Sequence, residues 1–443
     1  MIAKDKAQEI IRRALASSKA DEAAVNLRDE QGAHLRFARN TASTSGADTG
    51  PSLTVTSTFG QKTGSVTVNQ LDPASLKDAV ARSEEIARLA PDDPEHMPLL
   101  GPQEYAAVDA WDQPTASEGP ERMARGAAAA IKAASSRQLV AAGFTRTTAQ
   151  VEALGNSKGL FAYHRSTAAS FSTTIRTADG TGSGWAGRAA RRISEVDYAG
   201  AAAIAAEKAI ASRAPRQLAP GNYPAILEPA CVANLLDLLL GGMDERRADE
   251  GRSYFAGPRG GTRLGETLFG KEVDIRSDPA HSSCAARPWS GEGLPQRPRA
   301  WIEHGRVASL SCDRFWAAKK KVDPVPRAPN TLMAGGQGTL ADLIRSTRKG
   351  VLVTSLWYIR SVDPQTMLYT GLTRDGVFWI ENGEIAYPVN NFRWNESPVS
   401  VLKKIDAMSA SAPIPERGSE TPSSMVPALR VSQFAFTSVS DAV

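Results

Sequence analysis

GVLVTSLWYIRSVDPQTMLYTGLTRDGVFWIENGEIAYPVNNFRWNES, residues 350–397, is the most informative stretch of this chain. Branched and aromatic residues alternate here with glycine-bearing turns, which predicts several strands. Polar and aromatic side chains are also dense between positions 357 and 375, where a purely structural sheet would alternate apolar residues with bland polar ones. We therefore expect a substrate-binding or partner-binding surface in this segment, with the candidate residues Trp357, Tyr358, Arg360, Arg374 and Asp375.

The residue types of this segment suggest how such a surface would work. Arg360 or Arg374 would pair with a peptide carboxylate or with an acidic side chain of a partner subunit. Trp357 and Tyr358 would form an apolar wall. The alternative is a network at the edge of the domain core, because aromatic residues combined with arginine are typical of interfaces and of ordered strand ends alike.

The rest of the chain predicts an α+β protein with two helix-flanked mixed sheet units and a larger, strand-rich C-terminal domain. A length of 443 residues suggests two or three domains. The expected parts are an N-terminal unit over 1–100, a proline-rich connector over 101–119, a middle unit over 120–215 and the C-terminal domain over 216–443. Within the first unit, a turn at residues 30–32 is expected to separate two strands.

One helix of the C-terminal domain is apolar on nearly every face. Pro229 opens it, residues 235–240 read LLDLLL, and Gly241 and Gly242 end it. Such a helix is typical of a core or an interface. Its single acid, Asp237, is the buried-carboxylate candidate and belongs to the candidate substrate-binding or partner-binding residues. The alternative, which we expect, is a hydrogen-bonded interior acid.

Charge, cysteine content and hydropathy restrict the protein class. The net charge of +4 is small and dispersed, so we expect no nucleic-acid partner. Three cysteines do not suggest a disulfide framework, and they fit a reducing compartment. The first residues are typical of an amphipathic helix, not of a secretory signal, and no apolar run reaches membrane-spanning length. We expect a cytoplasmic protein without a membrane partner.

Three motifs of the C-terminal domain carry a family resemblance. They are RSYFAG at residues 252–257, the stretch from RP at 287–288 to EGLP at 292–295, and FWIENGEI at 378–385. With these motifs the chain resembles, over nearly its whole length, the TldD/PmbA family, once called modulators of DNA gyrase and regarded as metallopeptidase subunits. The three parts of the chain look like the three domains of that family.

The catalytic branch of that family carries a His-Glu-x-x-x-His helix and a cysteine near the C-terminus. Two imidazoles about one helical turn apart share a metal, and the adjacent Glu takes a proton from metal-bound water. Counting back from RSYFAG, Leu236 and Gly241 stand at the histidine positions and Asp237 stands at the acid position. The matching tail, residues 413–425, has no Cys or His. The chain is therefore similar to the TldE (PmbA) branch, which lacks the zinc motif.

The resemblance implies a noncatalytic subunit of a TldD/TldE-type metallopeptidase that acts on unfolded or flexible peptides. It implies no cofactor in this chain, with zinc only in a TldD-like partner. The partner would be that metal-bearing homologue, or the chain itself in a homodimer. A second hypothesis is a self-associating peptide-binding or scaffold protein without a peptidase partner. A third is an autonomous hydrolase that uses Cys312 or the pair His281 and Cys284.

Overall fold

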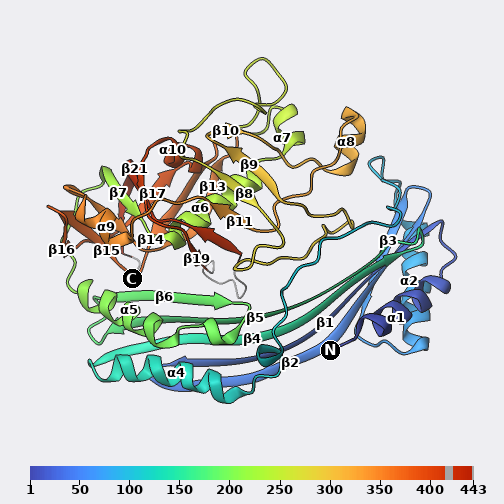
Figure 1. The fold of residues 1–443 in the computed structure, drawn as a ribbon, viewed down its shortest axis with the longest axis horizontal. Coiled ribbons are helices and arrows are strands. Elements are labelled where there is room, and N and C mark those ends of the chain that lie inside the picture. Colours follow the sequence, from blue (N-terminus) through green and yellow to red (C-terminus); the bar gives the residue numbers. More distant parts are fainter. Residues whose placement is uncertain (415–422, 442–443) are drawn as a thin grey trace.

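The computed structural model describes residues 1–414 and 423–441. Its N-terminal half is built on one six-stranded antiparallel sheet with the order β3-β2-β1-β4-β5-β6 (Figure 1). The first block contributes β1 (Glu22–Ala38), β2 (Thr41–Phe59) and β3 (Lys62–Val68), and the second contributes β4 (Leu139–Asn156), β5 (Phe161–Thr177) and β6 (Ser183–Ala190). The central pair runs from Ala24 opposite Asn156 to Phe37 opposite Gly143. The two expected units thus share a single sheet.

Four helices cover one face of this sheet, and the C-terminal region stands over the other face (Figure 1). They are α1 (Lys4–Ala16), α2 (Pro73–Leu89), α4 (Pro120–Ser135) and α5 (Tyr198–Ala211). Alternate strand residues such as Val25 and Leu27 pack with Ile10 of α1. The alanine-rich α5 lies very close to β6, since a Cβ added at Gly184 would stand 2.2 Å from a backbone oxygen of that helix.

The expectation of a turn at residues 30–32 is wrong. β1 runs through this position without a break, and Glu30 pairs with Gly50 on one side and with Gln150 on the other. The polar residues lie on a strand because strands on both sides satisfy its backbone hydrogen bonds. The chain turns instead at Arg39 and Asn40, both with positive φ, as a two-residue hairpin of the primed type requires.

The connector over 101–119 contains one short helix, α3 (Gln113–Ala116), and is anchored along its length. The Tyr105 hydroxyl donates to the Gly293 carbonyl at 2.7 Å, and the Thr167 amide donates to the Ala110 carbonyl at 2.8 Å. The connector therefore ties the N-terminal sheet to a loop of the C-terminal region.

The C-terminal region contains two further sheets. The first follows the order β13-β14-β17-β21-β7-β12-β15-β16, with β18 also paired to β21. Its strands are β7 (Gly221–Leu227), β12 (Lys349–Val353), β13 (Leu356–Asp363), β14 (Leu368–Thr373), β15 (Val377–Glu381), β16 (Glu384–Pro388), β17 (Asn391–Glu396), β18 (Ile405–Met408) and β21 (Leu429–Ser440). The second follows the order β10-β9-β8-β11-β20-β19. Its strands are β8 (Ile275–Ser277), β9 (Arg299–Glu303), β10 (Arg306–Val307), β11 (Thr331–Met333), β19 (Ala412–Ile414) and β20 (Ser424–Val426).

The helix α6 (Pro229–Gly242) contacts strands of both sheets and lies in their common core. Leu235, Leu236 and Leu239 are almost fully buried there. The expected apolar, buried helix is confirmed, as is the α+β class. The remaining helices are short: α7 (Glu245–Asp249), α8 (Arg314–Lys320), α9 (Leu340–Arg345) and α10 (Pro398–Lys403). In the described part of the chain, no helix has the length and apolar character needed to cross a bilayer.

Candidate functional site

The segment at residues 357–375 contributes the outermost strand of the larger C-terminal sheet. β13 lies at the end of the strand order and pairs with β14. Trp357, Tyr358 and Val362 on this strand are exposed by 40%, 56% and 52%. Tyr358 has a φ of +53°, and the register with β14 shifts between Trp357 and Arg360. This irregularity lets two consecutive aromatic residues reach solvent, where a regular strand would turn one of them inward.

Both candidate arginines of this segment lie over aromatic rings. The guanidinium carbon of Arg374 is 5.0 Å from the centre of the Trp357 ring, and that of Arg360 is 4.3 Å from the centre of the Tyr358 ring. The Nε atom of Arg374 is buried and makes no hydrogen bond within the described residues. The structure therefore brings Trp357, Tyr358, Arg360 and Arg374 together as two cation–π pairs at one sheet edge.

Asp375 does not join this surface. Its side chain is buried, and it accepts a hydrogen bond from the Ser183 hydroxyl on β6 at 2.7 Å. The backbone at Asp375 has a φ of +59°, and the Thr354 hydroxyl donates to its carbonyl. Asp375 thus connects the N-terminal sheet with the C-terminal region.

The expectation that Asp237 is a hydrogen-bonded interior acid is wrong. Asp237 is exposed, and no hydrogen bond or ion pair to its side chain is found within residues 1–414 and 423–441. The surrounding protein nevertheless removes part of its hydration and raises its pKa, as in a recess that water still reaches. Burial likewise raises the pKa of Tyr369 on β14; Arg247 opposes that rise, and the Asp237 carboxylate adds to it.

The two positions that the resemblance assigns to histidines have opposite environments. Leu236 is 1% exposed and packs in the core, whereas Gly241 is exposed and has no side chain to offer. The strands β19 and β20, which flank the tail matching the cysteine-bearing segment, contact α6. Part of that tail, residues 415–422, lies outside the described residues.

These residues do not fit a zinc site. Hydrocarbon and bare backbone cannot coordinate a cation, and Asp237 alone offers one carboxylate where zinc takes three or four protein ligands. Across the two described ranges, no group of three or more His, Cys, Asp and Glu side chains is placed as metal ligands would be.

Cysteine reactivity has little support in this structure. Cys312 is 1% exposed, and burial, reinforced by Glu245, raises the pKa of its thiol to about 12. A thiol that stays protonated is a poor nucleophile. Cys284 is buried as well, and its pKa rises to about 11, opposed by Arg191. His281, three residues earlier, lines a separate cavity that does not include Cys284.

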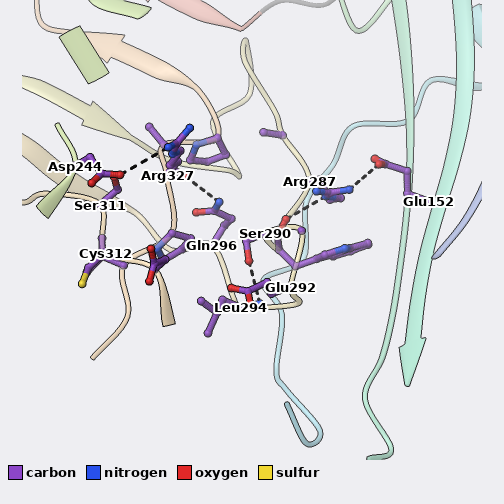
Figure 2. A pocket seen from close by; sticks show the side chains of 18 residues that line it. Glu152, Asp244, Arg287, Ser290, Glu292, Leu294, Gln296, Ser311, Cys312 and Arg327 are labelled. Atoms are coloured by element: carbon purple, nitrogen blue, oxygen red, sulfur yellow. Dashed lines mark hydrogen bonds and ion pairs between the residues drawn. The ribbon is translucent and has the colours of Figure 1, made fainter. Parts of the chain in front are cut away.

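A cavity of about 610 Å³, which the sequence did not predict, lies where β4 meets the C-terminal region (Figure 2). Its wall includes Glu152 of β4, the loop over residues 286–296 and the segments around Cys312 and Arg327. Cys312 and the EGLP motif, both singled out in the sequence, lie in this wall, but the sequence did not join them because the lining segments are far apart along the chain.

Comparisons with known proteins agree with this architecture. Residues 220–438 match the model of the PmbA/TldA metallopeptidase C-terminal domain, and residues 109–213 match that of the PmbA/TldA metallopeptidase central domain. The chain has the fold of TldE from Thermococcus kodakarensis, with a TM-score of 0.87, 19% identity, and coverage of 97% of this chain and 99% of that one.

Two curated relatives are named metalloproteases. One is Metalloprotease PmbA of Escherichia coli O157:H7, 24% identical over 346 residues, which are 74% of each chain. The other is a metalloprotease of Methanothermobacter thermautotrophicus, 25% identical over 165 residues, which are 33% of this chain and 35% of the relative. The two domain matches together span most of the sequence, and the chain belongs to the PmbA/TldD family.

Proposed function

We propose that this chain is a noncatalytic, TldE-like subunit of a TldD/TldE-type metallopeptidase that acts on unfolded or flexible peptides. In this proposal a metal-bearing homologue supplies the zinc and the catalytic groups. The present chain supplies part of the peptide-binding space and stabilises the assembly.

One observation carries the proposal. By the count back from RSYFAG, the resemblance places the zinc helix of the catalytic branch at α6, where Leu236 is buried in the core and Gly241 stands at the second histidine position. A chain with this helix retains the family fold without the groups that activate water. Its use in proteolysis would then depend on another subunit.

The edge strand β13 supports the second half of the proposal, that the chain associates with another polypeptide. Exposed tryptophan, tyrosine and arginine are the residues enriched in protein interfaces. An outer strand also offers backbone groups that an additional strand or an extended peptide can pair with. Trp357, Tyr358, Arg360 and Arg374 are therefore the proposed contact residues.

Affinity capture tests the proposal directly. The tagged chain is purified from its own host, and its partners are identified by mass spectrometry. We expect a homologue with a His-Glu-x-x-x-His helix to co-purify, and the pair to degrade a flexible protein such as casein that neither subunit degrades at the same rate alone. Capture of no such homologue, together with full activity of the isolated chain, would overturn the proposal.

The second candidate, a self-associating peptide-binding protein, draws on the same β13 surface. It predicts a homodimer in the absence of any zinc-bearing homologue, which light scattering on the purified chain would detect. A monomer that captures the homologue with one-to-one stoichiometry would exclude it.

A further inference from the structure

The cavity in Figure 2 is formed by parts of the chain that fold into different layers. Glu152 comes from the N-terminal sheet, while Asp244, Ser311 and Arg327 come from the C-terminal region. Arg287 bridges the two parts, since it donates to Glu152 at 2.8 Å and to the Trp289 carbonyl at 3.1 Å. The cavity volume of about 610 Å³ lies within the usual range of ligand sites, which often occur at such domain boundaries.

Acidic groups outnumber basic groups in the cavity wall. Its four carboxylates belong to Glu152, Asp244, Glu292 and Asp313, and its two guanidiniums belong to Arg287 and Arg327. Arg314, outside the lining, pairs with Glu292 at 3.8 Å, which leaves an excess of one negative charge at the wall. Such a wall favours a cationic ligand.

The pair between Asp244 and Arg327 is loose. Their nearest charged atoms are 3.7 Å apart, and the Arg327 side chain is 67% exposed, whereas Asp244 is only 19% exposed. An exposed pair at this distance contributes little free energy. Asp244 is held in place by a different contact, because it accepts a hydrogen bond from the Arg247 amide at the start of α7. A ligand cation can therefore replace Arg327 without disturbing the carboxylate.

Gln296 offers a further polar group to a ligand in this cavity. Its side chain lies between the Asp244 side and the Ser290 side of the cavity (Figure 2), and the residue is 92% buried, being 8% exposed. Its Nε2 atom donates to the Arg327 carbonyl at 3.0 Å, but no hydrogen bond reaches its Oε1 atom from the described residues. This oxygen belongs to a residue that lines the cavity and keeps contact with solvent there, so a donor-rich ligand can take the place of water at it.

We propose that this cavity binds an arginine or lysine side chain of an extended peptide, whose cation replaces Arg327 at Asp244 and whose N–H groups donate to Gln296. The assignment deepens the proposed function and rests on it in one respect, namely that the ligand is a peptide. The charge preference follows from the cavity wall alone.

Binding to the isolated, full-length chain tests the proposal. The probe is a blocked pentapeptide, acetyl-Gly-Gly-Arg-Gly-Gly-amide, titrated by calorimetry. The matched control probe carries citrulline, which keeps the shape and removes the charge, and a third probe carries lysine. We expect the arginine and lysine peptides to bind at least about tenfold more tightly than the citrulline peptide, with an affinity that falls as salt is added.

Two substitutions with opposite expected effects separate a binding role from a structural one. Asp244→Asn removes the charge but retains a good N-cap for α7. It should lower the affinity for the arginine peptide at least about tenfold. Arg327→Ala removes the cation that competes for Asp244 and should raise the affinity for the same peptide several-fold. The control Glu303→Gln removes a negative charge from β9, outside this cavity, and should leave the affinity unchanged.

Equal affinity for the arginine and citrulline peptides would overturn the proposal, as would weaker binding by Arg327→Ala. The outcome is independent of the test of the proposed function, which relies on capture of a zinc-bearing homologue. Arginine-specific binding, if no such homologue is captured, would support the cavity site and refute the proposed peptidase role. Capture of the homologue, if the chain shows no preference for the arginine peptide, would support the peptidase role and refute the cavity site.

Discussion

At the scale of single residues, the boundary between the N-terminal sheet and the C-terminal region contains ionisable groups that have lost most of their water. His164 on β5 is 7% exposed and contacts the Trp289 ring edge-on. Burial, reinforced by the nearby charges of Arg191 and Arg287, lowers its pKa to about 4. The imidazole is therefore neutral in the folded chain at pH values where it is partly charged after unfolding.

His164 is expected to make folding sensitive to mild acid. The pKa in the folded chain lies below the ordinary value of 6.5, so the unfolded chain binds more protons between pH 6.5 and pH 4. The contribution of neutral His164 to the free energy of unfolding is fully present above that window. It is lost as the pH drops through the window, by up to about 3 kcal/mol. Urea unfolding of wild type and His164→Gln at several pH values measures this loss. The variant should show a shallower decline, and the exposed His304→Asn should behave like wild type.

Ser183→Ala is expected to weaken the junction between β6 and the C-terminal region. It removes the hydroxyl that donates to buried Asp375, which costs about 1–3 kcal/mol when a charged acceptor loses its donor. Equilibrium unfolding in urea gives the difference. Ser45→Ala, at an exposed position of β2, is the control and should change stability by less than about 0.5 kcal/mol. A Ser183 variant as stable as this control would contradict the structural role.

At the scale of elements, α6 contributes to the stability of the core, and β13 provides the proposed contact surface. α6 lies in the shared core of both C-terminal sheets, whereas β13 presents aromatic side chains at a sheet edge. Substitutions in the two elements should accordingly affect different measurements.

In α6, Leu239→Ala is expected to destabilise the chain by about 2–5 kcal/mol, because Leu239 is fully buried and its loss leaves a cavity. Thermal and urea unfolding provide the measurement. The neighbouring Leu238→Ala removes a half-buried side chain and should cost clearly less. Equal costs would mean that the burial of this helix is misassigned.

In β13, the double variant Trp357→Ala/Tyr358→Asn is expected to lose partner capture while keeping its stability within about 1 kcal/mol of wild type. Asparagine is chosen because position 358 has a left-handed backbone, which asparagine tolerates. Ile385→Ala is the matched control, since β16 lies at the opposite end of the same sheet and Ile385 is 44% exposed. Capture that survives in the double variant and fails in the control would place the contact elsewhere.

Local patterns in the sequence were sufficient for some elements and not for others. The apolar run around Leu236 predicts a buried helix because every face of it is hydrocarbon. The direction of Asp237 does not follow from that pattern, since only the packing of two sheets decides which side of α6 meets solvent. Asp375 looks like an exposed turn residue, and the serine that binds it lies 192 positions away. The polar and glycine residues at positions 30–32 resemble a turn until β4 is placed beside them.

At the scale of the whole molecule, the chain is a family member whose proposed role requires another subunit. The isolated chain is expected to hold no stoichiometric zinc, because Leu236 and Gly241 offer no ligands. Elemental analysis after dialysis should find less than about 0.1 zinc per chain, since a preformed structural site would retain its metal. A zinc-bearing homologue prepared in parallel is the control. One tightly held zinc per chain would contradict this account.

The pairing of β1 with β4 has a practical consequence for anyone who dissects this protein. The proline-rich connector looks like a natural place to cut, yet the seam between the pieces would run through the middle of one hydrogen-bonded ladder. Either fragment alone would expose a long row of unsatisfied amides and carbonyls and would tend to aggregate. Co-expressed fragments, by contrast, should find each other, and this chain would make a better split-protein reporter than a source of separate modules.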